Sequence, residues 1–147
     1  MNKSFFVDSN IFIESLKKSY QKEAKDILFL IFSDKHNDFF INEVIFDEVY
    51  FHLIIKNKLQ DNYREEFLFE MLNLFSFLES KKEILLIARN YIVNFRLRTH
   101  DALILATTKF YNVDFLISFD SDFIDIATKE NIKIISSVSD LKTILEE

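Results

Sequence analysis

Four carboxylates stand far apart in the sequence, at points where one secondary-structure element should give way to the next. Ligand sites of open α/β sheets lie outside the carboxyl ends of the strands, so such side chains can converge although the chain separates them. Carboxylates that converge repel one another and resist ionisation unless a cation lies between them. The pattern therefore predicts a site for a hard divalent cation. The four are Asp8 in FFVDSNIF, Glu48 in INEVIFDEVYF, Asp101 in RTHDALILATT and Asp120 in FLISFDSDF.

Two of these acids also have a structural explanation. Asp8 follows the apolar run SFFV, where an aspartate is more often a helix N-cap than a metal ligand. Ser9 or Asn10 can also cap that helix, so Asp8 is not required for this role. Asp101 lies in the first turn of a predicted helix that Thr99 can cap, which leaves Asp101 as a partner of the helix dipole or as a ligand.

Glu48 is harder to explain as part of the scaffold. A carboxylate on an apolar stripe of a helix either reaches solvent at the edge or is held by a partner in a cleft. The acids Glu43 and Asp47 have simpler explanations, in the helix dipole and in exposure to solvent. We therefore choose Glu48 as the second functional acid. Its neighbours one helical turn away are Val44, Ile45, Phe51 and His52.

The fourth position is shared by two acids. Asp120 and Asp122 flank Ser121 after the run DFLIS, and one of them is expected to cap the next helix while the other faces the cleft. Asp120 is nearer the end of the strand and is the chosen ligand, with Asp122 in a supporting position. His100 is left out, because a lone histidine at a helix start is more often solvated and adjacent helical residues point in different directions.

Short apolar runs alternate with helical patterns along the whole chain, which predicts a mostly parallel sheet covered by helices on both faces. We expect one domain, residues 1–147, that folds as a three-layer α/β/α sandwich with five strands. Strands are predicted at 4–7, 38–41, 83–86, 114–118 and 132–136. Helices are predicted at about 9–18, 21–34, 43–59, 62–79, 87–96, 100–111, 121–129 and 139–146. The helices at 43–59 and 62–79 have no strand between them and should project as a hairpin with a phenylalanine-rich surface.

The chain has neither glycine nor proline, although its helices must still end. A helix often ends in a left-handed residue, for which asparagine is the next choice after glycine. We expect Asn37, Asn112 and Asn131 to take this role, because each follows a helical pattern and precedes an apolar strand.

Composition excludes several kinds of function. Without cysteine, disulfides, thiolate metal sites and thiol nucleophiles are impossible. No apolar run approaches the roughly 18 residues that span a bilayer, and the N-terminus lacks a signal-peptide pattern, which predicts a soluble cytoplasmic protein. The net charge of −6 opposes non-specific binding to nucleic acid, so any nucleic acid would be held by local contacts.

Four motifs, in order, resemble those of PIN-domain nucleases, of which the VapC toxins of bacterial and archaeal toxin–antitoxin pairs are the best known. Each motif alone is weak, and their order over nearly the whole chain makes the resemblance specific. The sequence departs from the family in lacking the glycine common before the fourth strand and in carrying serine at position 118 where threonine is common. The motifs are VDSNIF at 7–12, NEVIFDEV at 42–49, DALILAT at 101–107 and LISFDSDF at 116–123.

The resemblance implies endonucleolytic cleavage of RNA with Mg²⁺ or Mn²⁺, leaving a 5′-phosphate and a 3′-hydroxyl. Asp8, Asp101 and Asp120 would hold the metal, and Glu48 would orient the attacking water. Relatives of the toxin type usually form homodimers and are neutralised by a small antitoxin whose peptide enters the active-site groove. Supporting contacts are expected from Asn10, Ser118 and Asp122, and contacts to RNA from Lys56, Arg96, Arg98 and Lys109.

Two other functions are compatible with the same motifs. A PIN-like fold that has lost catalysis could act as a binding module through its phenylalanine-rich hairpin, and a PIN nuclease could serve RNA processing outside any toxin–antitoxin pair. A phosphoryl-transfer receiver domain is disfavoured, because only one acid follows the first strand.

Overall fold

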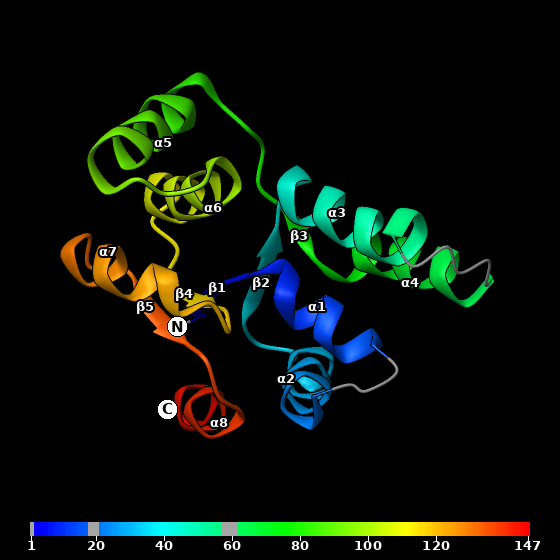
Figure 1. The fold of residues 1–147 in the computed structure, drawn as a ribbon. Coiled ribbons are helices and arrows are strands. Elements are labelled where there is room, and N and C mark those ends of the chain that lie inside the picture. Colours follow the sequence, from blue (N-terminus) through cyan, green and yellow to red (C-terminus); the bar gives the residue numbers. More distant parts are fainter. Residues whose placement is uncertain (1, 18–20, 57–61) are drawn as a thin grey trace.

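Five short strands form one parallel sheet at the centre of the computed structural model, which describes residues 2–17, 21–56 and 62–147 (Figure 1). The strand order is β3-β2-β1-β4-β5. The central strand β1 is buried on both faces, and its residues Phe5, Phe6 and Val7 have no exposed surface, as expected for a strand covered by helices on both sides. The strands are β1 (Ser4–Val7), β2 (Asp38–Ile41), β3 (Ser76–Phe77), β4 (Phe115–Ile117) and β5 (Lys133–Ile135).

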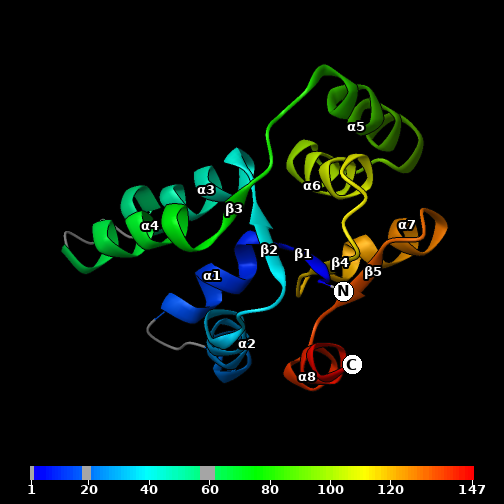
Figure 2. The ribbon, with the colours of Figure 1, turned by 180° about the vertical axis from the view of Figure 1, so that it is seen from behind.

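Helices cover both faces of the sheet, which confirms the predicted three-layer arrangement. In the two opposite views, α1, α2 and α8 lie on one side and α5, α6 and α7 on the other, while α3 and α4 project together as the predicted hairpin (Figures 1 and 2). None of the helices in the described parts of the chain is long and apolar enough to cross a bilayer. The α-helices are α1 (Ser9–Leu16), α2 (Lys22–Ser33), α3 (Glu43–Tyr50), α4 (Asn62–Leu74), α5 (Lys82–Phe95), α6 (Thr99–Phe110), α7 (Ile124–Lys129) and α8 (Val138–Glu146). A π-helical segment, Phe51–Lys56, continues α3, and a 3₁₀ turn, Ser121–Phe123, precedes α7.

Three phenylalanines stack across the middle of the sheet. Phe5 of β1 is in register with Phe39 of β2 on one side and with Phe115 of β4 on the other. The ring centroids are 5.0 Å and 5.1 Å from that of Phe5, and both ring pairs are stacked. This row of side chains helps to fix the register of the two strands whose carboxyl ends carry the site.

The position of the third strand was predicted wrongly. Residues 83–86 belong to the first turns of α5, and the strand is instead formed by Ser76–Phe77. In α5 the buried residues Ile84, Ala88 and Tyr91 follow a helical spacing, whereas Leu85 and Leu86 are exposed, so an apolar run that resembles a strand is a helix with two leucines in solvent. The helix predicted at 62–79 ends at residue 74, because the chain enters the edge strand directly afterwards.

Asparagine replaces glycine at two of the three expected positions. Asn112 and Asn131 have positive φ angles of 53° and 58°, which confirms their left-handed role. The prediction for Asn37 was wrong: α2 ends in an extended residue, Asp34, whose carboxylate accepts the backbone N–H of Asn37 at 2.8 Å, so no left-handed residue is needed. The third positive φ angle among the described residues, 56°, belongs instead to Arg96.

The stacked phenylalanines give a direct test of the sheet. We predict that Phe5→Ala lowers the free energy of unfolding by about 3–5 kcal/mol, because it removes a fully buried ring from between two others. Phe29→Ala, at a side chain that is 70% exposed, is the matched control and should change it by less than about 0.5 kcal/mol. Urea unfolding measures both, and equal losses would contradict the assigned core.

Candidate active site

The carboxyl ends of β1 and β4 meet where the sheet changes direction. The chain leaves β1 toward β2 on one side and leaves β4 toward β5 on the other, and ligand sites of parallel sheets lie at such a switch point. Asp8 follows β1 directly, and its backbone N–H donates to the carbonyl of Ile117, the last residue of β4, at 3.0 Å. Asp120 lies in the loop after β4. The topology thus places these two acids at one edge of the sheet.

Asp8 is a buried carboxylate held by several donors. Only 4% of its surface is exposed. Its Oδ1 accepts the backbone N–H of Ser9 at 2.7 Å, and its Oδ2 accepts the Ser118 hydroxyl at 2.6 Å and the Asn10 amide at 3.2 Å. Burial raises the pKa of Asp8 to about 7, and the charge of Glu48 adds to this rise against the lowering effect of the Ser118 and Ser9 hydrogen bonds. Asp8 is therefore both the N-cap of α1 and the most perturbed acid at this edge of the sheet.

Glu48, on α3, faces the same place. The Ser9 hydroxyl donates to Glu48 Oε2 at 3.0 Å and lies 3.4 Å from Asp8 Oδ1, so Ser9 bridges the two acids. Glu48 Oε1 is buried without a hydrogen-bond partner, and His100 Nδ1 lies 3.7 Å away from it. Burial raises the pKa of Glu48, and the charge of Asp101 adds to the rise. The alternative acid, Glu43, is exposed and accepts the Ser80 hydroxyl instead.

Asp101 is half-buried in the first turn of α6 and completes the group. Burial raises its pKa most, followed by the charge of Asp120, and the charge of Asp122 has a smaller effect in the same direction. Asp120 accepts the backbone N–H of Asp122 at 2.9 Å, so the acid nearer the strand is itself the helix cap. The expectation that one of the two acids caps the turn and the other faces the cleft is met: Asp120 caps the turn, and Asp122, which was expected in the supporting position, lines a pocket beside Asp101.

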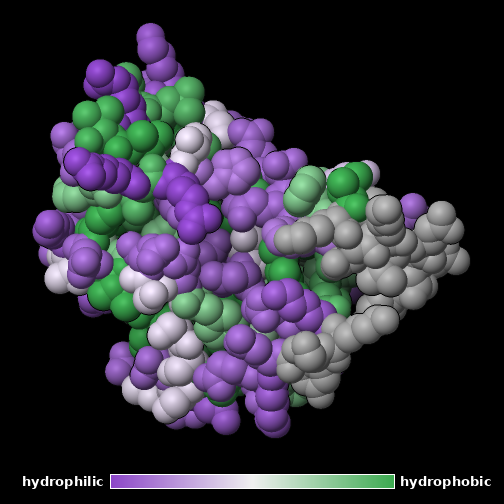
Figure 3. Space-filling view, in the orientation of Figure 1, coloured by the Kyte–Doolittle hydropathy of each residue, from purple (hydrophilic) through white to green (hydrophobic). Residues whose placement is uncertain are grey.

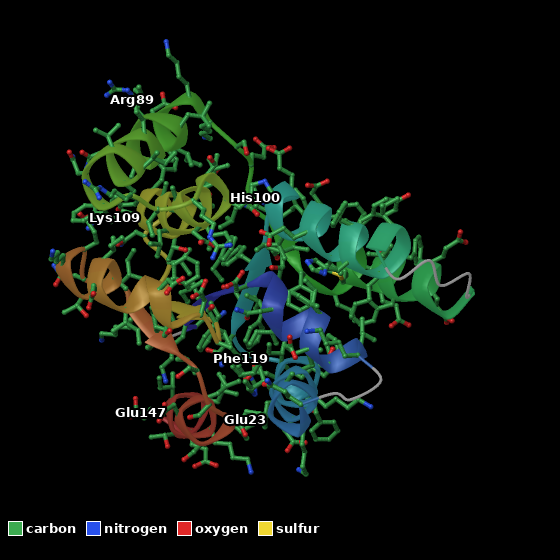
Figure 4. All side chains as sticks on the ribbon, in the orientation of Figure 1. Glu23, Arg89, His100, Lys109, Phe119 and Glu147 are labelled. Carbon is green, nitrogen blue, oxygen red and sulfur yellow. The ribbon has the colours of Figure 1, made fainter. Side chains whose placement is uncertain are left out.

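A side-chain hydrogen bond fixes α3 relative to α6. The buried Asn42 caps α3 by accepting the backbone N–H of Ile45 at 3.1 Å, and its amide donates to the Thr107 hydroxyl of α6 at 3.3 Å. This contact sets the helix that carries Glu48 against the helix that carries Asp101. Figure 4 shows His100 at the start of α6.

Ser118 and Asn10 connect the two strand ends. Besides their bonds to Asp8, the Asn10 amide donates to the Ser118 hydroxyl at 3.2 Å. The backbone N–H of Asp120 donates to Ser118 Oγ at 3.0 Å, and that of Phe119 donates to Asn10 Oδ1 at 3.2 Å. The loop that carries Asp120 is thereby tied to Asp8. Sequence reasoning placed Asn10 and Ser118 near the site but assigned Ser9 only as a possible cap, although its hydroxyl joins two of the acids.

These oxygen atoms suit a hydrated divalent cation. Within the described parts of the chain, no three Asp, Glu or His side chains already stand as a complete metal-binding group. Mg²⁺ keeps several water ligands and needs only one or two direct carboxylates, so an incomplete protein shell is compatible with it. Glu48 Oε1 has no hydrogen-bond partner, and burial raises the pKa values of Asp8 and Asp101, so a cation bound beside these acids would favour their ionised forms. The residues therefore fit Mg²⁺ or Mn²⁺.

A pocket of about 440 Å³ adjoins the acids. Asp101 and Asp122 line it together with the cations Arg96, Arg98 and Lys129. Two of these cations were among the expected RNA contacts, and Lys129 was missed. Hydrophilic side chains gather in the middle of the face shown in Figure 3, where α1, α3 and α6 meet.

The other two expected RNA contacts do not join this pocket. Lys109 lies at the far end of α6 from His100 (Figure 4) and donates to the backbone carbonyl of Glu130 at 2.9 Å. The side chain of Lys56 lies outside the described part of the structure.

Comparison with known proteins agrees with this architecture. A family profile described as PIN domain matches residues 5–129. The chain is similar to Ribonuclease VapC2 of Methanocaldococcus jannaschii, with 34% identity over 134 residues that cover 83% of this chain and 87% of that protein. Among solved structures, it resembles a toxin–antitoxin complex from Klebsiella pneumoniae (TM-score 0.63, 24% identity, 90% of this chain and 97% of the other). It also resembles VapBC2 of Rickettsia felis bound to a promoter DNA fragment (TM-score 0.64, 14% identity, 89% and 96%).

The buried acid predicts how stability depends on pH without metal. The folded-state pKa of Asp8 is about 7 against 3.8 for a free side chain, so its contribution to stability is complete below pH 3.8 and is lost as the pH rises through 7. In EDTA, wild type should lose more unfolding free energy between pH 5 and pH 8 than Asp8→Asn does, by an amount on the order of 1–3 kcal/mol. Urea unfolding measures this. The exposed control Asp140→Asn should keep the wild-type dependence, and an unchanged dependence in Asp8→Asn would contradict the assigned burial.

Proposed function

The chain belongs to the PIN-domain family, and from that membership we propose that it is a Mg²⁺- or Mn²⁺-dependent endoribonuclease and the toxin of a toxin–antitoxin pair. One observation supports this most: acids from four separate segments lie close enough at the switch point of the sheet to interact, and burial raises the pKa values of three of them, Asp8, Glu48 and Asp101. A group of this kind becomes fully ionised when a cation binds, and a metal with carboxylates is the usual apparatus for hydrolysing phosphodiesters.

We propose that Asp8, Asp101 and Asp120 hold the metal, directly or through water. When bound, the metal would supply Lewis-acid activation of the scissile phosphate and neutralise charge in the transition state. Ser118 and Asn10 keep Asp8 in place through their hydrogen bonds, and they connect it to the loop that carries Asp120. The proposed geometry thus depends on side chains that directly follow β1 and β4.

Glu48 is the proposed general base. Its Oε1 is free of hydrogen bonds, and burial raises its pKa toward the range in which a carboxylate takes up a proton effectively. The attacking water gives its proton to this oxygen while its own oxygen bonds to phosphorus. The bond from phosphorus to the 3′ oxygen breaks, and that oxygen takes a proton from a solvent water to leave as the 3′-hydroxyl, while Glu48 returns the proton that it took up to solvent. The phosphate stays on the 5′ side. Ser9 holds Glu48 through Oε2, and the buried Oε1 has no hydrogen bond within the protein.

The partners follow from the same family membership. A relative of this chain is named a ribonuclease, and two structural neighbours are toxin–antitoxin assemblies. We propose that one PIN domain, residues 1–147, acts on RNA in the cytoplasm as a homodimer and binds a small cognate antitoxin. Large apolar side chains exposed on α2, the α3–α4 hairpin and α5 provide surface for these contacts; they include Phe29, Phe51, Ile55, Phe69, Leu72, Leu85 and Val93.

The alternatives are distinguishable. A catalytically idle binding module would not need the acids, and their substitution would leave its function unchanged. A nuclease of RNA processing would use the same site but would bind no antitoxin. A short neighbouring reading frame that encodes a DNA-binding protein, and co-purification of that protein with this chain, would favour the toxin function.

The first test is cleavage of an RNA panel in Mg²⁺ or Mn²⁺. Asp8→Asn and Asp101→Asn should each reduce the rate about a hundredfold, because each removes a negative ligand oxygen. Asp140→Asn is the matched control for Asp101, since Asp140 is also an acid in the first turn of a helix but lies on α8. It should cleave like wild type. Equal cleavage rates in wild type and the three variants would contradict the assignment of nuclease activity to this site.

A second test separates the two acids of the fourth motif. Asp120→Asn should reduce cleavage about tenfold or more, whereas Asp122→Asn should reduce it less, because the charge of Asp120 acts more strongly on Asp101. The two variants are compared at several Mn²⁺ concentrations, and the required Mn²⁺ should rise mainly in Asp120→Asn. The opposite ranking would assign the ligand to Asp122.

A further inference from the structure

The backbone at Arg96 has a left-handed conformation that arginine rarely adopts. Arg96 ends α5 with φ 56° and ψ 32°, and its backbone N–H donates to the carbonyl of Ile92 at 3.1 Å. A non-glycine residue here costs about 1 kcal/mol or more, and asparagine tolerates it better than arginine. Among the residues that the structure describes, the other two left-handed positions are occupied by asparagine, Asn112 and Asn131. Arginine is therefore the exception in this protein, and strained residues of this kind concentrate at functional sites.

The side chain of Arg96 lies in a pocket that contains two more cations. Arg96 lines the pocket beside the acids, with Arg98 two residues later and Lys129 from the end of α7. Arg98 is also the N-cap residue of α6 and makes no capping hydrogen bond with its side chain. The same pocket therefore lies next to the N-terminal turn of a twelve-residue helix, whose dipole also favours an anion.

The three cationic side chains of this pocket are available to bind an anion. Within the described residues, none of them belongs to an ion pair, although Lys129 lies over the ring of Phe95 at 5.3 Å. The charge of Arg98 lowers the pKa of Asp101, so the pocket and the acid group interact. The acids that line the pocket balance its three cations in number; these acids are Asp101, Asp122 and Asp125. A divalent cation bound at the acid group would leave the pocket net positive.

We propose that Arg96, Arg98 and Lys129 form a subsite for a backbone phosphate of the RNA strand next to the one that is cut, and that the left-handed conformation of Arg96 directs its guanidinium toward that phosphate. The proposal rests on the proposed ribonuclease function and adds to it how the strand is positioned. It also accounts for RNA binding by a chain of net charge −6, since binding depends on one local pocket next to the metal. Phosphate contacts position a strand without reading its sequence, so this subsite should serve RNAs of different sequence equally.

The left-handed backbone makes an unusually clean test possible. Arg96→Gly removes the side chain and at the same time relieves the backbone strain, so the variant should be at least as stable as wild type. Asn112→Gly makes the same backbone change at a left-handed position that lines a different pocket. Lys142→Gln removes one positive charge from exposed α8. These two variants control for backbone and for net charge.

Binding is measured in an Asp8→Asn background, so that the RNA stays uncut, by fluorescence anisotropy of short single-stranded RNAs of several sequences in Mg²⁺. Arg96→Gly should weaken binding about tenfold for every sequence, as expected for one lost charged hydrogen bond. It should also reduce the slope of log K against log salt by about 0.7, as expected for one lost phosphate contact on a single strand. Neither control should do so.

The outcomes separate the subsite from the nuclease. Unchanged affinity and salt slope in Arg96→Gly would overturn the subsite even if wild type cleaves RNA. A weaker, less salt-dependent Arg96→Gly would support the subsite even if wild type does not cleave, in which case only the catalytic proposal fails. Loss of affinity equal to that of Lys142→Gln would show a general charge effect and would also overturn it.

Discussion

The structure depends on one electrostatic constraint: a carboxylate buried at the end of the central strand, with other carboxylates around it. Asp8 is almost fully buried, and burial moves its pKa to about 7, beside the charges of Glu48 and Asp101. Ionised acids in such a place destabilise a fold unless donors or a cation compensate for them. The chain provides the donors through Ser118, the backbone of Ser9 and Asn10, and in the proposed function a cation provides the remaining compensation. The hydrogen bonds that hold Asp8 are thus also those that would orient it toward the proposed cation.

The scaffold converts this constraint into a defined geometry. The stacked rings of Phe5, Phe39 and Phe115 fix neighbouring strands, so the strand ends that carry Asp8 and the loop of Asp120 stay together. Asn42 and Thr107 join the two helices that carry the remaining acids. The backbone of Arg96 has a strained left-handed conformation next to the site, where we propose that its side chain binds a phosphate. The residues that shape this edge of the sheet are therefore also those to which the proposed function is assigned.

Much of this was predictable from sequence, for physical reasons. Apolar runs such as SFFV mark the central strands, so the layered fold was predictable from the sequence. The four acids stand next to these strands or near the starts of helices, so the sequence also predicted that they lie at one edge of the sheet. The edge strand Ser76–Phe77 has only two residues, both exposed, and the apolar residues around it continue the helical spacing of the preceding segment. The run at 83–86 that resembled a strand is helical, because its buried positions continue to Ala88 and Tyr91. Asn37 was misassigned because a carboxylate can end a helix without a left-handed residue. The bridging role of Ser9 and the pocket shared by Arg96 and Lys129 depend on packing between distant segments, which no local pattern encodes.

We propose that the acids with raised pKa values form a site that a divalent cation completes. The most direct measurement is a calorimetric titration of Mn²⁺ into the metal-free protein at pH 7, in two buffers with different enthalpies of ionisation. Asp8, with a pKa of about 7, is then about half protonated, so Mn²⁺ binding should release about half a proton per chain or more. The observed heat should therefore differ between the buffers. Absence of binding, or binding with identical heats in both buffers, would contradict the proposal that a divalent cation binds these acids and displaces protons from them.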